Sequence, residues 1–307
     1  METYDFIMAG GGLAGLSLAY QLVNGPFADS RILVLDIAAK GENDRTWCYW
    51  ATDPIAFDQA VSHRWTSLAF YSHTYSNTFQ ISPYEYRMVR GIDFYNVVLD
   101  DLESRSNVDF RTERVIKIRD FPGHAEVESE RTVYEGTWVF DSRFLPEEYT
   151  ERKEKSRDAG RGAYHYLMQH FLGWEIETES PAFDPLTVTL FDFRTPQKGE
   201  MRFMYTLPFS QHRALVEFTL FSADLLEDAE YVSALESYLN ELIGLESYRV
   251  TGREKGVIPM TDEPFPRRLG DRVLAIGTKG GRVKASTGYA FHRVQQDTAA
   301  IVASLAR

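Results

Sequence analysis

The chain has 307 residues, of which 44% are hydrophobic and 25% are charged, and its formal net charge is -12. This length and composition exclude disordered and collagen-like architectures, and they allow one or two domains that each bury a core. The acidic balance argues against a nucleic-acid-binding protein, because neutralising phosphates requires a surplus of Lys and Arg.

The N-terminal segment predicts a βαβ unit. Residues 4–9 are an apolar run typical of a buried parallel strand, residues 16–23 have apolar side chains at helical spacing, and residues 31–36 predict a second buried strand. A βαβ unit of this size carries a nucleotide at its first turn.

That first turn is rich in glycine and is followed by an acidic residue at the end of the second strand, Asp36. The glycines permit a tight turn and a close approach of the backbone to a pyrophosphate, which the N-terminus of the helix attracts. We expect Asp36 to accept hydrogen bonds from the adenosine ribose. A glycine-rich turn without a ligand is the alternative. The predicted cofactor-binding residues of the turn are Gly10, Gly12, Leu13, Ala14 and Gly15.

The middle of the chain predicts a helix and then mostly strands. Residues 93–105 have helical spacing, and short apolar segments between residues 108 and 141 indicate strands. The charged, glycine-containing residues 153–162 predict a loop or domain boundary. Three strand-like runs follow and predict an antiparallel meander: residues 186–193, 202–207 and 214–221.

The end of the chain returns to an α/β pattern. A helix is expected at residues 228–243, a buried strand ends at Gly277, and a glycine-rich loop with Lys284 and Gly288 leads into a last helix near residue 289. This loop is a candidate second cradle for a flavin, and an ordinary strand-loop-helix connection is the alternative. Arg45 is a candidate contact for a flavin phosphate or ribose, or a surface salt bridge.

Six separated segments carry a resemblance to a known family: residues 4–7 with the glycine turn, and residues 43–50, 169–174, 207–219, 258–261 and 286–289. In the same order along the chain, they resemble segments of bacterial lycopene β-cyclases. The resemblance implies a Rossmann-like FAD-binding domain of the hydroxylase-like flavoprotein fold, with an inserted antiparallel β-sheet substrate domain. On this basis we expect the FAD-binding domain at residues 1–60, 91–150 and 250–307, and the substrate domain at residues 61–90 and 151–249.

The resemblance also implies a function. It is the cyclisation of lycopene or a related linear carotenoid to β-ionone rings, with FAD in its reduced form and NAD(P)H only as the reductant. The implied catalytic acid is Glu217. Two departures from the family stand out. Phe218 occupies the place where some members have a second acidic residue, and the chain is expected to lack a C-terminal region that helps to enclose the substrate.

The residues alone leave the role of Glu217 open. By strand alternation it shares a face with Leu215 and Thr219, so a half-solvated position is the alternative. An acid that protonates an alkene has to be kept neutral by apolar surroundings. Asp192 is the second candidate acid. His165 and His170 have no carboxylate or cysteine beside them that could complete a metal site, so we expect no metal site.

The rival functions are an FAD monooxygenase or a polyprenyl reductase on the same fold, and a non-catalytic carotenoid- or flavin-binding relative. Hydroxylases of this fold carry Gly-Asp at the end of the late strand, whereas here Thr278 follows Gly277. This difference favours the cyclase.

The compartment and the membrane contact follow from charge and cysteine content. The single cysteine, Cys48, cannot form an intrachain disulfide, and no secretory signal begins the sequence, so we expect the reducing cytoplasm. Residues 249–293 contain ten basic and four acidic residues. We expect either a solvated surface or a peripheral docking face for the inner side of the membrane.

Overall fold

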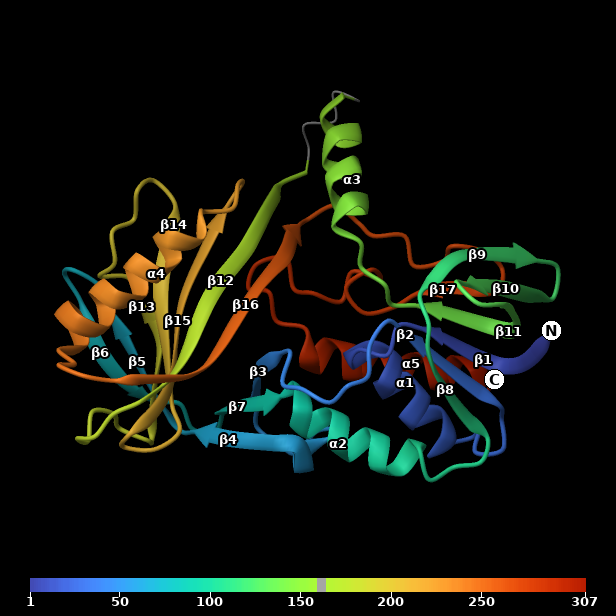
Figure 1. The fold of residues 1–307 in the computed structure, drawn as a ribbon, viewed down its shortest axis with the longest axis horizontal. Coiled ribbons are helices and arrows are strands. Elements are labelled where there is room, and N and C mark those ends of the chain that lie inside the picture. Colours follow the sequence, from blue (N-terminus) through green and yellow to red (C-terminus); the bar gives the residue numbers. More distant parts are fainter. Residues whose placement is uncertain (159–163) are drawn as a thin grey trace.

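The computed structural model describes residues 1–158 and 164–307, which form two seven-stranded sheets and a three-stranded sheet (Figure 1). The first sheet has the order β8-β2-β1-β11-β10-β9, with β17 beside β11. The strands β8, β2, β1, β11 and β17 are parallel, whereas β9, β10 and β11 pair as antiparallel hairpins. The bounds are β1 (Glu2–Ala9), β2 (Ile32–Asp36), β8 (Val108–Thr112), β9 (Val115–Phe121), β10 (His124–Ser129), β11 (Val133–Asp141) and β17 (Val273–Ala275).

Three helices share a core with this sheet: α1 (Leu13–Val23), α2 (Gly91–Leu102) and α5 (Phe291–Leu305). Apolar side chains at helical spacing turn one face of α2 and of α5 toward this core, whereas α1 is buried around most of its surface. Phe94 of α2 and Phe291 of α5 are fully buried in this core. The central strands β1 and β2 are buried on both faces, which explains why their sequences are continuous apolar runs.

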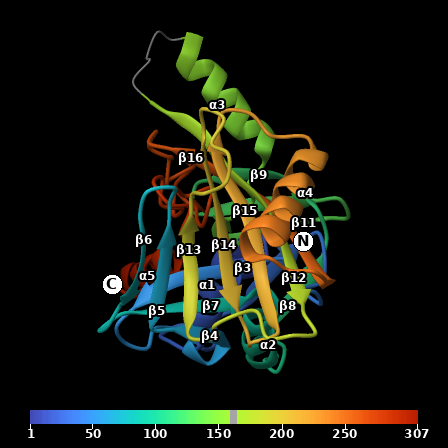
Figure 2. The same ribbon diagram turned by 90° about the vertical axis from the view of Figure 1, so that its left-hand side faces the viewer.

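The second sheet has the order β16-β12-β15-β14-β13-β5-β6. The helix α4 (Asp228–Ser237) and a π-helical turn (Tyr238–Ile243) cover its outer face (Figure 2). Val216, Phe218 and Leu220 of β15 pack against them. The strands are β5 (Ser67–Tyr71), β6 (Ser76–Gln80), β12 (Tyr166–Glu177), β13 (Thr187–Asp192), β14 (Met201–Pro208), β15 (Arg213–Ser222) and β16 (Arg249–Thr261).

The inner face of the second sheet packs against the three-stranded sheet, which has the order β3-β7-β4. Its strands are β3 (Thr46–Ala51), β4 (Val61–Trp65), which follows a 3-10 turn (Asp58–Ala60), and β7 (Glu85–Arg90). Trp65 and Tyr86 from this small sheet share a core with Leu215 of β15. The residues at alternate positions of β15 therefore face two different environments, one beneath α4 and one beneath the small sheet.

The expected meander is confirmed, because β13, β14 and β15 pair antiparallel in chain order. The expectation of a loop at residues 153–162 is wrong for residues 153–158, which belong to α3 (Pro146–Asp158), and residues 159–162 lie outside the described part of the chain. Acidic residues in the first turn of α3 and the Glu151–Lys155 pair one turn apart favour this helix. The strands expected between residues 108 and 141 are β8, β9, β10 and β11, and the last nine residues of this range form one continuous strand, β11.

The strand β16 pairs with β12 along almost its whole length, so residues 249–261 are part of the second sheet. We had expected residue 250 to begin the last segment of the FAD-binding domain. Since the chain rejoins the first sheet only at β17, we propose that this boundary lies after Thr261. In the described part of the chain, none of the helices combines the length and the apolar character needed to cross a bilayer.

Candidate functional site

The turn between β1 and α1 leaves the N-terminus of the helix open. Gly12 is the N-cap and no side chain caps the helix. A Cβ atom at Gly15 would lie 1.9 Å from the carbonyl oxygen of Gly10, whereas a Cβ at Gly12 would meet no atom within 4 Å. Leu13 and Ala14 begin the helix, so their amides have no partner within it. Open space beside uncapped amides fits an anionic group such as a phosphate.

Asp36 lies beside this turn, as the sequence predicts. Its carboxylate accepts a hydrogen bond from the backbone N–H of Gly11 at 2.7 Å and lies 3.3 Å from the ammonium of Lys40. The end of β2 and the glycine turn therefore form one edge of the sheet. Its predicted contact with a ribose stays a prediction.

The glycine-ended strand β17 reaches the same edge. Gly277 has a positive φ of 59°, and a Cβ there would lie 2.8 Å from the Cβ of Ala14. The late loop and the start of α1 are therefore in contact, although they are far apart in the sequence. This contact supports the prediction that the two glycine segments contribute to a single site.

The loop that follows is compact and presents unpartnered polar atoms. The backbone N–H of Gly288 donates to the carbonyl of Lys284 at 2.8 Å, which closes the loop on itself. A Cβ at Gly288 would lie 2.1 Å from Oε1 of Gln169. Both this oxygen and Oγ1 of Thr287 are buried without a hydrogen-bond partner in the described residues. Buried polar atoms without partners are suited to bind a polar group or a water molecule.

Arg45 directly precedes β3, which begins at Thr46. Its guanidinium donates to the carbonyl of Asp44 at 2.8 Å, and its own carbonyl accepts from the N–H of Gly91 at 2.6 Å. It is close enough to Glu254 to favour the charged form of that side chain. Arg45 therefore influences Glu254 of the second sheet, and its predicted contact with a flavin phosphate or ribose stays a prediction.

Glu217 lies in a row of residues that crosses the inner face of the second sheet. In the strand register, Gly173 of β12 is opposite both Glu217 of β15 and Glu254 of β16, and Tyr205 of β14 is opposite Glu217. Residues paired directly across strands share a face. The row is therefore Glu254, Gly173, Glu217 and Tyr205, and the two glutamates hydrogen-bond to each other across the glycine.

Burial is the largest influence on the pKa of Glu217. The residue is only 9% exposed, so the alternative of a half-solvated position is wrong. Desolvation, followed by the charge of Glu254, raises the pKa of Glu217 well above its usual range. The Thr219 hydroxyl donates to the carboxyl and opposes this shift. Burial therefore favours the protonated form of Glu217 over the charged carboxylate.

Aromatic side chains from three strands and the late loop surround this acid. The hydroxyls of Tyr86 and Tyr289 lie 3.1 Å apart, and Tyr289 also hydrogen-bonds to Tyr205 and Trp50. Since Tyr289 directly follows Gly288, the late loop reaches the Glu217 row through this side chain. The structure therefore connects the predicted flavin loop to the predicted acid.

Comparisons with known proteins agree with this geometry. A family model described as "Lycopene cyclase protein" matches residues 5–307. The chain belongs to the lycopene cyclase family. It is 28% identical over 319 residues to a lycopene beta-cyclase of Paracoccus sp., and this match covers 99% of the chain and 74% of that protein. It is also 26% identical over 309 residues to a chloroplastic neoxanthin synthase of Solanum tuberosum, covering 94% of the chain and 58% of that longer protein.

The solved structures place this lycopene cyclase family member in a wider fold class. A geranylgeranyl bacteriochlorophyll reductase-like protein from Thermoplasma acidophilum superposes with a TM-score of 0.68 at 14% identity, and the match covers 99% of this chain and 78% of that one. The p-nitrophenol 4-monooxygenase of Pseudomonas putida gives a TM-score of 0.65 at 15% identity, covering 100% of this chain and 82% of that one. At these identities the likeness shows the fold alone. It is the FAD-dependent hydroxylase- and halogenase-like flavoprotein fold, as expected from the resemblance.

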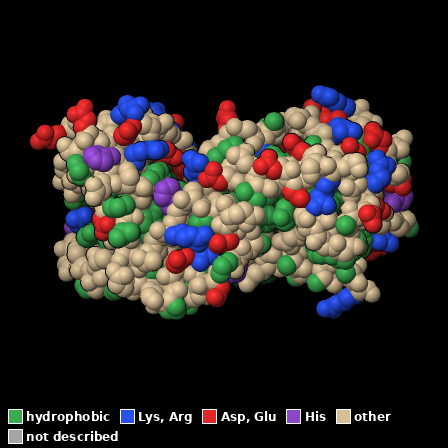
Figure 3. Space-filling view, turned by 90° about the horizontal axis from the view of Figure 1, so that it is seen from below, with side chains coloured by type: hydrophobic (Ala, Val, Ile, Leu, Met, Phe, Trp, Pro, Cys, Tyr) green, Lys and Arg blue, Asp and Glu red, His purple; other side chains and the backbone are tan. Residues whose placement is uncertain are grey.

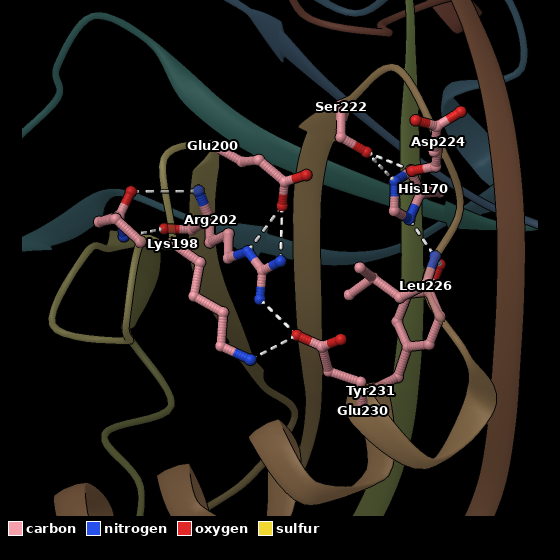
Figure 4. A network of polar contacts seen from close by, with 10 residues as sticks. His170, Lys198, Glu200, Arg202, Ser222, Asp224, Leu226, Glu230 and Tyr231 are labelled. Carbon is pink, nitrogen blue, oxygen red and sulfur yellow. Dashed lines mark hydrogen bonds and ion pairs between the residues drawn. The ribbon is translucent and has the colours of Figure 1, made fainter.

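His170, conspicuous in the sequence, has a structural role in this family member. It is buried on the α4 side of the sheet, where its Nε2 lies 2.7 Å from Oγ of Ser222 and its Nδ1 lies 2.5 Å from the hydroxyl of Tyr231 (Figure 4). Burial lowers the pKa of His170, so the ring stays neutral. The described residues contain no cluster of three or more His, Cys, Asp or Glu side chains suited to a metal ion.

Asp192, the second candidate acid, faces away from Glu217. It lies beneath the α4 side, bound to the guanidinium of Arg194 and to the hydroxyl of Tyr238 at 3.1 Å. Asp192 belongs to β13, which β14 separates from the strand of Glu217, β15. An ion-paired carboxylate on the opposite face is poorly placed to act as an acid at the Glu217 row.

The sequence interpretation missed Glu254 and its neighbours Gly173 and Thr46. The hydroxyl of Thr46 donates to Oε2 of Glu254 at 2.6 Å, so the start of β3 holds this second carboxyl. A signal for Glu254 was present: residues 249–261 alternate between long charged side chains and small or apolar ones, with Glu254 on the apolar face. The surplus of basic residues in the segment hid this alternation.

Proposed function

We propose that the chain is a cyclase that closes the ends of a linear carotenoid, such as lycopene, into β-ionone rings by acid catalysis. The observation that carries this proposal is Glu217, which is buried on the inner face of the second sheet in surroundings that raise its pKa well above the usual range. Membership of the lycopene cyclase family supports the substrate class. The chain spans 58% of the length of the plant relative, so the activity of whole relatives reaches this chain only as a proposal.

The cyclisation adds one proton to the carotenoid and later removes another. Glu217 donates its proton to the terminal alkene carbon, which leaves a tertiary carbocation. The neighbouring double bond attacks this cation and closes a six-membered ring. Loss of a ring proton to the Glu217 carboxylate forms the ring double bond and restores the acid. The aromatic faces of Trp50, Tyr86 and Tyr205 are suited to stabilise the cation.

We propose FAD as the cofactor, held at the open amides of Leu13 and Ala14, beside Asp36, and at the loop from Lys284 to Gly288. The unpartnered oxygens of Gln169 and Thr287 fit a polar ring at that loop. In its reduced form the bound flavin would supply negative charge that favours a carbocation, without net redox change. NAD(P)H would serve only to reduce it.

The function is tested by giving the purified protein FAD, a reductant and lycopene in liposomes. We expect the desalted protein to keep a flavin absorbance spectrum and to form a cyclic carotene, because ring closure rearranges bonds without oxidation or reduction. Products are identified by chromatography, and NADPH is followed in parallel. One NADPH consumed per product, with a saturated or oxygenated carotenoid, would instead establish the reductase or monooxygenase. Flavin binding without any product would favour a non-catalytic relative.

We also propose that the protein is a peripheral membrane protein on the cytoplasmic side, because its substrate dissolves only in lipid. The structure weakens the electrostatic case made from the sequence. Several of the basic residues form ion pairs with acidic side chains of other segments: Arg249, Lys255, Arg267, Lys279 and Arg282. Basic and acidic side chains are also intermixed on the face that Figure 3 shows.

We therefore expect the protein to float with anionic liposomes and to bind them less tightly at high salt. The loss of binding with salt should be smaller than ten unpaired charges, at about 1 kcal/mol each, would give. Co-flotation is measured at low and high salt, with neutral liposomes as the control. Equal binding to both kinds of liposome at both salt concentrations would show that charge plays no part in docking.

A further inference from the structure

Glu217 and Glu254 reach each other because the strand between them has no side chain at the crossing point. Gly173 lies opposite both residues. A Cβ atom at position 173 would lie 3.0 Å from Cγ of Glu254 and 3.4 Å from its Oε1. Any larger residue would therefore press against one carboxyl of the pair, so the contact between the glutamates depends on this glycine.

The surroundings assign different states to the two carboxyls. Glu254 is half-buried, accepts the hydrogen bond of Thr46 and lies near Arg45. The hydrogen bond between the glutamates lowers the pKa of Glu254 and raises that of Glu217. Burial is the largest influence on both pKa values and raises each, and the overall rise is larger for Glu217. Where the pair holds one proton, that proton is therefore on Glu217, and Glu254 is the charged member.

The other titratable groups that face the pair leave this assignment intact. Glu175, on the same face of β12, raises the pKa of Glu254 by repulsion, and it is a smaller influence than burial and the two hydrogen bonds. Tyr205 and Cys48 face Glu217, and burial raises the pKa of both, so they stay neutral where the pair titrates. In the singly protonated form, the pair has a net charge of one negative unit.

We propose that Glu254 is a positioning residue for the cyclisation, holding the reactive proton on Glu217 and promoting its return after each ring closure. This inference rests on the proposed function. When the O–H bond of Glu217 breaks and the new C–H bond forms, the pair has two negative charges across Gly173. When the ring C–H bond breaks, its electrons form the ring double bond and its proton returns to Glu217, which relieves the repulsion. No oxidant or reductant takes part.

The first test needs neither flavin nor substrate. The infrared C=O stretching band of protonated carboxyl groups is titrated in the wild-type chain and in its Glu217→Gln and Glu254→Gln variants. We expect a band that persists above the pH at which an ordinary glutamate ionises, and that Glu217→Gln removes. In Glu254→Gln, where the amide still accepts a hydrogen bond but has no charge, the midpoint should fall by about one pH unit or more. An unchanged midpoint would overturn the proposal.

The second test uses the cyclase reaction. In Glu254→Gln we expect the alkaline limb of the kcat profile to move to lower pH by a similar amount, with activity partly retained at acidic pH and partly restored at neutral pH by Glu254→Asp. A profile that keeps its shape would overturn the positioning role. If the infrared titration behaves as expected but no wild-type product forms, the proton assignment stands and the proposed function fails.

Gly173→Ala supplies a matched test of the geometry. The added methyl group should separate the carboxyls and lower the infrared midpoint in the same direction as Glu254→Gln. Gly252→Ala on β16 is the control, because a Cβ there makes only ordinary contact with Glu175 at 3.4 Å. An unshifted midpoint in a folded Gly173→Ala variant would contradict the direct contact, and Glu254→Gln keeps the proposal testable if Gly173→Ala does not fold.

Discussion

The Glu217→Gln variant is expected to lose cyclase turnover by a factor of about 10² to 10⁴, the range that general acid–base groups contribute. The amide has the size of the carboxyl and keeps an acceptor for the Thr219 hydroxyl, but it is not acidic enough to protonate an alkene. Turnover is measured as cyclic carotene formed per flavin. The flavin content should stay unchanged, because the glycine turn and the late loop do not contain this residue.

Two further variants make the loss interpretable. Glu217→Asp draws the carboxyl back by one methylene and should be badly impaired but measurable, because proton transfer depends on placement. Glu177→Gln is the control, since Glu177 is on the same sheet but pairs with Arg249 at its exposed end. Full activity in Glu217→Gln would exclude Glu217 as the acid. Glu254 would then be the next candidate acid, because Asp192 lies on the opposite face of the sheet.

The sequence predicts those elements whose pattern is local. The apolar runs of β1 and β2 and the glycine turn between them follow from burial on both faces and from the needs of a tight turn. The meander β13-β14-β15 is predicted for a similar reason, since short strands separated by turn residues pair with their neighbours. In these regions, neighbouring residues are sufficient to determine the structure.

The rest of the site depends on pairings between distant residues. Glu217 and Glu254 belong to strands that do not neighbour each other, and only β12 brings their side chains onto one row. The contact of Gly277 with Ala14 likewise joins the two ends of the chain. Local periodicity contains no information about which strand lies between two others. The sequence therefore identified Glu217 through family resemblance, but it did not identify the second carboxyl.

The free energy of unfolding should also depend on pH through Glu217. An unfolded glutamate has a pKa of about 4.3, and burial raises the folded value well above the usual range. Between these two values the folded chain binds one more proton than the unfolded chain. The stabilisation from this extra proton is fully present below the unfolded pKa and is lost as the pH rises toward the folded pKa.

We therefore expect the wild-type chain to lose up to about 1.4 kcal/mol of stability per pH unit above pH 5 from this group, with a smaller loss in the same direction from Glu254. Glu217→Gln has no carboxyl to ionise, so its stability relative to the wild type should rise as the pH rises. Urea unfolding midpoints of the flavin-free proteins, followed by circular dichroism between pH 5 and pH 8, measure this difference. Since both chains share every other titrating group, a pH-independent difference would mean that Glu217 is not held protonated in the folded state. The expected divergence would link the loss of turnover in the same variant to a buried acid rather than to misfolding.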